Sequence, residues 1–288
     1  MTLLFPASLA ARVGRLTFVR YGGRLSHHKG SHLSRKTGAS LEFSDFKEYH
    51  PGDDIRHIDW NVYARTDTFY VKQFLDEQEL RVHIVLDASR SMDFDGKWPF
   101  AQQLAIGLGQ IALKNGDAVS ISQTADEPVK PVKRKGAGQS NAWTSRIAGF
   151  PEPAGNRSIT DSLSEIPHGT SLLFVITDAL EPNDRLHQWF RGLAARCRDV
   201  RLIVVRSAAE QHPDFLGDLR LIDSEGGPDT EVTMTPAAEQ AYVQRAGLHE
   251  LKLLESAAKY GVNVLFTSPQ TGSENVFTRH MRDARWVR

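Results

Sequence analysis

Residues 82–122 read VHIVLDASRSMDFDGKWPFAQQLAIGLGQIALKNGDAVSIS, and their pattern decides the fold class that we expect. Val82–Leu86 and Ala118–Ser122 are short apolar runs rich in β-branched residues, which favour strands. The Asn115-Gly116 pair before the second run is typical of a helix end. The stretch therefore predicts a strand–helix–strand unit. Large apolar residues recur at helical spacing between the strands, at Phe100, Leu104, Leu108 and Ile111.

The same alternation of short apolar runs and amphipathic segments extends to about residue 266. Further strands are expected at Leu172–Thr177, Leu202–Val205 and Val262–Phe266. Because Leu172–Ile176 is apolar throughout, this strand should be buried on both faces and lie in the middle of a sheet. Residues 80–288 thus predict an α/β fold, with a mainly parallel, Rossmann-type sheet flanked by helices.

Two further elements are expected near the carboxyl end of this region. A long helix should cover Pro236–Tyr260, with Leu251, Leu254 and Ala258 on its inner face. Alternating residues on both sides of SEGGPDT, between residues 218 and 234, predict a hairpin at the periphery of the sheet.

Residues 1–79 have a different pattern and predict a small β-rich module. Pro51-Gly52 indicates one turn, and a second reversal is expected near Arg65-Thr66-Asp67. Together these signals predict a three-stranded meander.

The composition is that of an ordinary globular protein, with 40% hydrophobic and 24% charged residues. Lys and Arg total 35, as do Asp and Glu, so no overall field favours nucleic acid or an anionic membrane. We therefore expect neither nucleic-acid binding nor membrane insertion. The single Cys197 fits a reducing compartment, and the first residues show no basic leader followed by a long apolar run, so the expected location is cytoplasmic.

Asp87, Ser89 and Ser91 form a D-x-S-x-S motif directly after the first predicted strand. Carboxyl ends of parallel strands form the binding crevice of such a sheet. One carboxylate and two hydroxyls suit Mg²⁺ or Mn²⁺, which keep a coordination position for a partner's carboxylate. The same side chains could instead line a polar crevice without metal, or only shape the turn through local hydrogen bonds.

Between a strand and a helix, this motif resembles the metal-ion-dependent adhesion site of the von Willebrand factor A fold. The resemblance implies an acid after the central strand, where Asp178 stands in LLFVITDAL. It also implies a threonine ligand in a third loop, but Arg157 occupies that position. Either Ser158 or Thr160 supplies the ligand, or the Arg157 guanidinium pairs with Asp87 and Asp178 and weakens metal binding.

Residues 38–65 are similar to the signature of domain-of-unknown-function family 58, and a looser resemblance covers roughly the whole chain. Acidic, basic and aromatic side chains of this segment either brace the small module or form a partner-binding surface. The signature residues that we single out are Glu42, Phe43, Asp53, Asp54, Arg56, Asp59, Trp60 and Arg65.

This resemblance implies a protein without known catalytic residues, of the type associated with MoxR AAA+ ATPases that remodel or mature protein complexes. We therefore expect a non-enzymatic adaptor or scaffold that presents the crevice around Asp87 and Asp178 to a protein partner, with such an ATPase as the expected partner. The sequence contains no G-x-x-x-x-G-K, G-x-S-x-G or H-E-x-x-H motif. The alternative from another class is a metal-dependent hydrolase that uses the same crevice.

Overall fold

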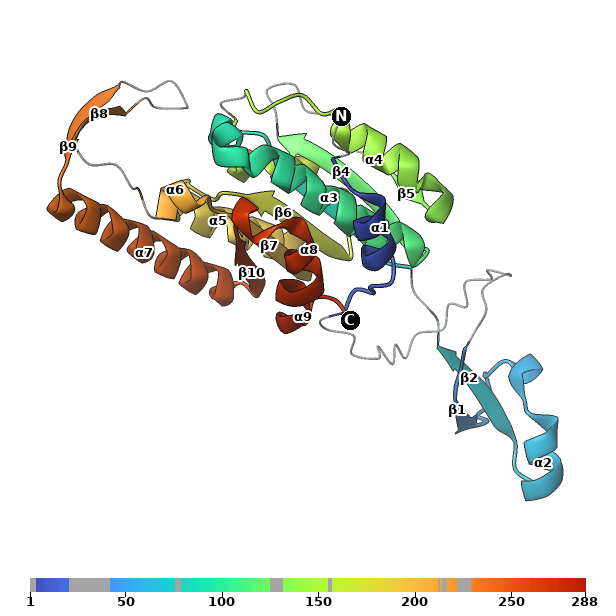
Figure 1. The fold of residues 1–288 in the computed structure, drawn as a ribbon. Helices are drawn as coiled ribbons and strands as arrows, with labels where there is room; N and C mark the ends of the chain where they lie inside the picture. Colours follow the sequence, from blue (N-terminus) through green and yellow to red (C-terminus); the bar gives the residue numbers. More distant parts are fainter. Residues whose placement is uncertain are drawn as a thin grey trace. The chain divides into compact units, whose positions relative to one another are not determined.

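A six-stranded sheet in the order β10-β7-β6-β3-β4-β5 forms the centre of the larger of two compact units (Figure 1). The computed structural model describes residues 4–20, 42–75, 79–124, 132–154, 157–211, 213, 217–221 and 229–288, but not the side chains of residues 42–45, 73–75, 219 and 221. All neighbouring strands are parallel except β4 and β5. The predicted α/β class and the central position of β6 are therefore confirmed. The strands are β3 Arg81–Asp87, β4 Ala118–Thr124, β5 Arg134–Lys135, β6 Leu172–Thr177, β7 Asp199–Val205 and β10 Val262–Thr267.

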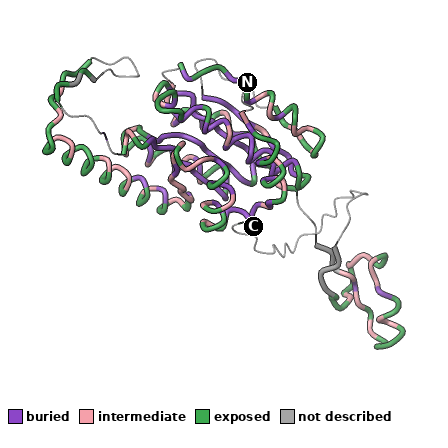
Figure 2. Tube along the Cα trace, in the orientation of Figure 1, coloured by how far each residue is buried: buried purple, intermediate pink, exposed green. Residues whose placement is uncertain are grey.

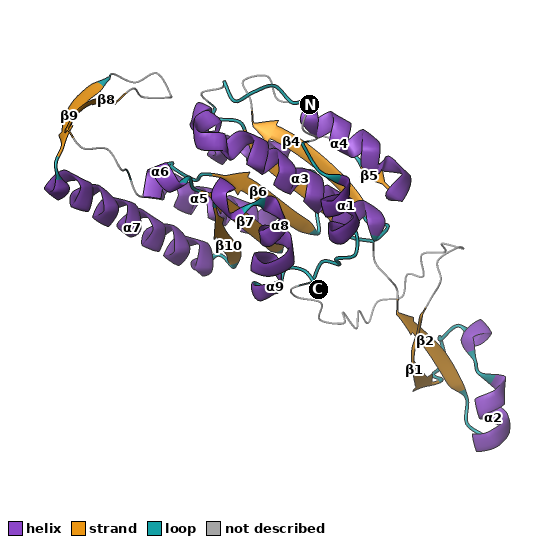
Figure 3. Cartoon of the chain, in the orientation of Figure 1, coloured by secondary structure: helices purple, strands orange, loops and turns teal. Residues whose placement is uncertain are grey.

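Helices cover both faces of this sheet (Figures 1 and 3). On one face lie α1 Ala7–Val13, α3 Lys97–Lys114, α4 Ser140–Ala148, α8 Ser273–Asn275 and α9 Met281–Asp283, and on the other α5 Asn183–Arg196 and α7 Pro236–Lys259. Shorter helical turns span Arg90–Gly96, Ala137–Gln139, Ile159–Glu165, Ala208–Gln211 (α6), Pro269–Thr271 and Val276–His280. Within the described residues, no helix is both long and apolar enough to cross a bilayer.

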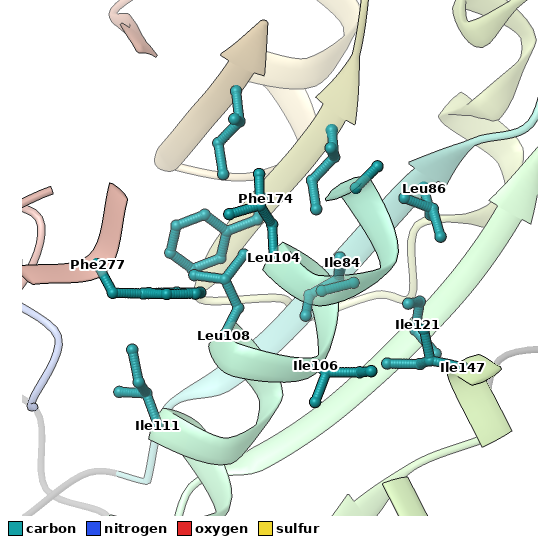
Figure 4. Close-up of a cluster of buried hydrophobic side chains, with 14 of the residues drawn as sticks. Ile84, Leu86, Leu104, Ile106, Leu108, Ile111, Ile121, Ile147, Phe174 and Phe277 are labelled. Carbon is teal, nitrogen blue, oxygen red and sulfur yellow. The ribbon is translucent and has the colours of Figure 1, made fainter. Parts of the chain in front are cut away.

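Successive strand residues point to opposite faces, so the sheet separates two apolar clusters. Ile84 and Phe174 face the cluster that contains Leu104 of α3 (Figure 4). Val85 and Val175 face the cluster on the other side, which contains α5. Burying each such side chain contributes about 1.5–3 kcal/mol. These clusters hold the carboxyl ends of β3, β4 and β6 in a fixed relation to each other.

Two glycines of α3 allow other elements to pack closely against it. A Cβ atom at Gly107 would lie 2.3 Å from the Phe277 ring, and one at Gly109 would lie 2.0 Å from the Trp143 ring. Glycine inside a helix costs about 1 kcal/mol relative to alanine. Here the burial of both aromatic rings offsets this cost in helix stability.

The face of α7 that points inward differs from the sequence prediction. Leu253 and Ala257 are buried against the sheet and α5, whereas Leu251, Leu254 and Ala258 are exposed. Much of α7 is accordingly exposed in Figure 2. The prediction used apolar spacing alone, and α7 carries apolar residues on more than one face. The predicted hairpin is confirmed, with β8 Gly217–Leu221 antiparallel to β9 Thr230–Met234.

The smaller unit contains a two-stranded hairpin with a helix between its strands. β1 Glu42–Glu48 pairs with β2 Tyr70–Leu75, and a 3₁₀ turn at Ile55–His57 and α2 Trp60–Thr66 connect them. The predicted three-stranded meander is therefore wrong. The expected middle strand is reduced to a single bridge at Ile58, because the Asp59 side chain accepts hydrogen bonds from the next N–H groups and starts α2.

The boundary between the two units also differs from the prediction of 1–79 and 80–288. Residues up to Arg24 group with Leu80–Arg288, and the smaller unit runs from Leu25 to Glu79. The reason is α1, whose Leu9 and Val13 side chains are buried in the α/β core beside α3. A short amphipathic helix does not reveal from its own sequence which surface will cover it.

Candidate functional site

Asp87, the last residue of β3, is held by both neighbouring strands. Its Oδ1 accepts hydrogen bonds from the Ser89 N–H at 3.0 Å and the Thr124 hydroxyl at 3.3 Å. Its Oδ2 accepts from the Thr177 hydroxyl at 2.6 Å. Thr124 ends β4 and Thr177 ends β6, so these contacts follow from the meeting of strand ends at one edge of a parallel sheet. The carboxylate is buried and fixed in orientation.

The D-x-S-x-S side chains lie together after β3. The hydroxyls of Ser89 and Ser91 are 3.0 Å apart, and Ser91 remains partly exposed. The contact from the Ser89 N–H to Asp87 is also a local turn-forming hydrogen bond. The same residues therefore shape the turn and form a polar cluster at this edge of the sheet, which we call the crevice.

Several acidic groups face this crevice. Burial, and then the charges of Asp178 and Glu181, raise the pKa of Asp87 to about 7. Burial, with a smaller effect of Asp178, also raises the pKa of Glu181. Such shifts indicate carboxylates held close together away from water, as occurs at functional sites.

A lysine supplies positive charge to the crevice. The Lys97 Nζ lies 2.8 Å from Asp178 Oδ2 and 2.6 Å from Glu210 Oε1, and the lysine side chain is fully buried. Glu210 Oε2 accepts from the Ser207 N–H at 2.8 Å, while the Ser207 Oγ accepts from the Glu210 N–H at 3.1 Å. This reciprocal pair is a capping box, and it fixes Glu210 at the start of α6.

The third loop reaches the crevice through Ser158 and Thr160. Their hydroxyl oxygens are 2.7 Å apart, and the Ser158 hydroxyl donates to Glu181 Oε1 at 3.0 Å. The Ile159 N–H donates to the same oxygen at 3.0 Å. The other Glu181 oxygen is buried and has no hydrogen-bond partner among the described residues. Glu181 thus joins the third loop to the loop that follows β6.

Arg157 does not pair with Asp87 or Asp178, which corrects that alternative from the sequence. Its Nη1 lies 2.5 Å from Glu165 Oε1, and its Nη2 donates to the Asp161 carbonyl at 3.3 Å. Both partners belong to the helical turn that begins two residues after the arginine. The turn therefore satisfies the guanidinium locally.

The sequence also contains signals for site residues that the sequence analysis did not predict, namely Lys97, Ser207 and Glu210. Lys97 begins α3, where the positive end of the helix dipole disfavours a cation, so a compensating acid was to be expected. Ser207 and Glu210 have the spacing of a capping box. No local signal indicates that Glu210 also reaches Lys97, because these residues are 113 positions apart.

The signature acids of the smaller unit mainly cap turns and form ion pairs. The Asp54 side chain accepts from the Arg56 N–H at 3.0 Å and pairs with its guanidinium, which holds the pKa of Asp54 well below its usual range. Asp59 caps α2 and lies 3.0 Å from the Lys72 Nζ. Asp53 lies 3.0 Å from the Lys47 Nζ. These contacts support the bracing interpretation for the acids.

The other signature residues differ from the acids in their exposure and contacts. Trp60 is 63% exposed and makes edge-to-face contacts with Tyr63 and Phe69. The Arg65 Nε donates to the Asn61 carbonyl at 3.1 Å. The exposed ring is compatible with a partner-binding role. The side chains of Glu42 and Phe43 lie outside the described residues.

The donor set fits a hard divalent cation only in part. Asp87, Ser89 and Ser91 offer the oxygen ligands that such an ion prefers, and the unpartnered oxygen of Glu181 adds negative charge. Asp178, however, already contacts the Lys97 ammonium group. In the part of the chain that the structure describes, no cluster of three or more His, Cys, Asp or Glu side chains could hold a metal.

Comparison with protein families agrees with the signature in the smaller unit. The family model described as protein of unknown function DUF58 matches residues 45–252. The chain belongs to the DUF58 family. This match extends from the signature of the smaller unit into α7, so it includes every crevice residue described above.

Relatives of this DUF58 protein include the uncharacterized proteins Rv1480 of Mycobacterium tuberculosis and Mb1516 of Mycobacterium bovis. Each is 27% identical over 246 residues, which cover 82% of this chain and 77% of the relative. Solved structures with weaker similarity include the conserved hypothetical protein BatB from Bacteroides thetaiotaomicron, with a TM-score of 0.41, 11% identity and coverage of 71% of this chain and 98% of that chain. The SpRpn10 VWA domain has a TM-score of 0.38 and 10% identity, over 69% of this chain and 94% of that chain.

Proposed function

We propose that this DUF58 protein is a non-enzymatic adaptor whose crevice, at the carboxyl ends of β3 and β6, binds a protein partner. One observation supports this function most directly. Phe94 is 48% exposed in the helical turn Arg90–Gly96, which begins within the D-x-S-x-S motif, and Leu180 is 51% exposed two residues after Asp178. A partner that bound at this edge of the sheet would cover both apolar side chains, and aromatic residues are enriched in the buried centre of interfaces.

The partner that we propose is a MoxR-type AAA+ ATPase, and the proposed role is the assembly or maturation of protein complexes. The crevice would act as a partly degenerate metal-ion-dependent adhesion site. Asp87, Ser89 and Ser91 would hold Mg²⁺ or Mn²⁺, with Ser158 or Thr160 on the third loop. The bound ion would supply a coordination position for a partner's carboxylate. Phe94 and Leu180 would contact apolar side chains of the same partner.

Direct binding to a purified MoxR-type ATPase from the same organism tests this proposal. We expect wild type to bind, and Phe94→Ser and Leu180→Ser to weaken binding about tenfold or more, because apolar anchors in a covered interface often dominate its free energy. Circular dichroism should show that both variants keep the wild-type fold, since about half of each side chain is exposed in the free protein. Arg12→Ala, on the amino-terminal helix α1, is a matched surface control and should bind as wild type does.

Two outcomes would contradict this function. Absence of binding by wild type, or equal binding by all variants, would rule out the proposed interface. Turnover in a phosphatase and nuclease screen with Mg²⁺ or Mn²⁺, abolished by Asp87→Ala, would instead support the metal-dependent hydrolase.

A further inference from the structure

Lys97 occupies a position that is unfavourable unless its charge is compensated. Its side chain is fully buried, and it is the first residue of α3, where unpaired N–H groups already carry partial positive charge. Burying an unpaired ammonium group is strongly unfavourable, because the charge loses its hydration. The compensation comes from Asp178 at 2.8 Å and Glu210 at 2.6 Å. The lysine is therefore part of a buried ion network.

This network uses a carboxylate that the resemblance to the adhesion site implies as a metal ligand. Asp178 is the acid after the central strand, and its Oδ2 accepts from the Lys97 ammonium group. Glu210, which completes the network, is held by the capping box of α6 and so keeps the lysine in place. We infer that Lys97 is the resident cation of the crevice: its ammonium group takes the place of a divalent ion at Asp178 and lowers the affinity of the crevice for Mg²⁺.

This inference rests on the proposed function in one respect, because both treat the crevice around Asp87 and Asp178 as a cation site. Arg157, the other cation considered for this role, pairs with Glu165 instead. An ammonium group beside the metal ligands would repel a divalent ion and also compete for Asp178. Removing Lys97 should therefore strengthen Mg²⁺ binding, whereas removing Arg157 should not.

Calorimetric titration of the metal-free full chain with MgCl₂ tests the inference without any partner. We expect Lys97→Gln to bind Mg²⁺ about tenfold more tightly than wild type or better, given one fewer positive charge near the ion. Arg157→Gln is the matched control and should remain within about twofold of wild type, because its partner is Glu165. The double variant Lys97→Gln/Asp178→Asn should lose the gain.

Several results would overturn the inference. One is that Lys97→Gln binds Mg²⁺ no more tightly than wild type, or does not bind it at all. Another is that Arg157→Gln gains as much Mg²⁺ affinity as Lys97→Gln. A third is that the double variant keeps the gain in Mg²⁺ affinity. Because Lys97→Gln leaves two carboxylates without their counter-ion, its folding is followed by circular dichroism with EDTA and with Mg²⁺. Refolding in Mg²⁺ supports the inference, and a chain unfolded at saturating Mg²⁺ contradicts it. Failure of the ATPase to bind would overturn the proposed function alone.

Discussion

His83 illustrates at the scale of one residue how burial sets a protonation state. It lies within β3, with Nδ1 2.8 Å from the Ser120 hydroxyl and Nε2 3.1 Å from the Ser122 hydroxyl. Burial lowers the pKa of the ring from 6.5 to about 4. Between pH 6.5 and 4 the unfolded chain therefore binds a proton that the folded protein does not. The neutral ring contributes stability that is present above about pH 6.5 and is lost as the pH falls toward 4.

The variant His83→Gln should remove this pH dependence. Between pH 7.5 and 4.5, wild type should lose about 2–3 kcal/mol more of its free energy of unfolding than the variant does. Urea unfolding at the two pH values measures both losses. The raised pKa of Asp87 acts in the opposite direction, with stability falling as the pH rises from about 4 to about 7, but it is present in both proteins and cancels in the comparison. Equal losses would contradict the lowered pKa of the His83 ring in the folded protein.

At the scale of the element, α7 combines a polar and an apolar contact surface. His187 of α5 interacts with Ser256 at 3.0 Å and Tyr260 at 2.9 Å, and Leu253 packs in the apolar cluster between these helices and the sheet. In this arrangement Leu251 points away from the core and is 58% exposed. Polar and apolar contacts together mark the buried face of the helix.

Two leucines on α7 give a matched test of this orientation. Leu253→Ala should destabilise the protein by about 2–5 kcal/mol, because it leaves a cavity in a packed cluster. Leu251→Ala should change stability by less than about 0.5 kcal/mol, since its side chain is exposed. Urea unfolding of the two variants gives the comparison. If Leu251→Ala were the more damaging change, the orientation of α7 predicted from apolar spacing would be the right one.

At the scale of the larger unit, Arg201 connects the sheet to segments near both ends of the chain. The fully buried guanidinium pairs with Asp199 at 2.8 Å, donates to the Trp286 carbonyl at 2.8 Å, and also donates to the Val19 carbonyl. The Val19 N–H donates to the Trp286 carbonyl at 2.9 Å. Residues 17–19 and 286–288 therefore lie side by side at the edge of the core.

Replacing Arg201 by alanine should destabilise the larger unit strongly. The change breaks the buried ion pair between Arg201 and Asp199, which costs about 3–5 kcal/mol. Arg12→Ala is a suitable control, because Arg12 forms an exposed ion pair with Glu274 that should contribute at most about 1 kcal/mol. Chemical denaturation of wild type and both variants measures the difference. A loss in Arg201→Ala no larger than in the control would contradict the structural role of this arginine.

The sequence by itself determined five of the six strands of the central sheet and half of the crevice. β3, β4, β6, β7 and β10 were recognisable because each contains a short apolar run rich in β-branched residues, which is a local property. The central position of β6 followed because a strand buried on both faces is apolar along its length. Asp87, Ser89 and Ser91 were recognisable because they directly follow such a strand. The hairpin β8–β9 followed from local alternation in the same way.

Only the tertiary structure decided the contacts between residues distant in the chain. Lys97 reaches Asp178 across 81 positions, and the buried face of α7 forms hydrogen bonds with α5. In the smaller unit, α2 stands where the middle strand was expected from two turn signals, and the Asp59 side chain caps its start. Charge pairing and helix orientation depend on which surfaces come into contact when the chain folds. Apolar periodicity is a local property of the sequence and does not identify those surfaces.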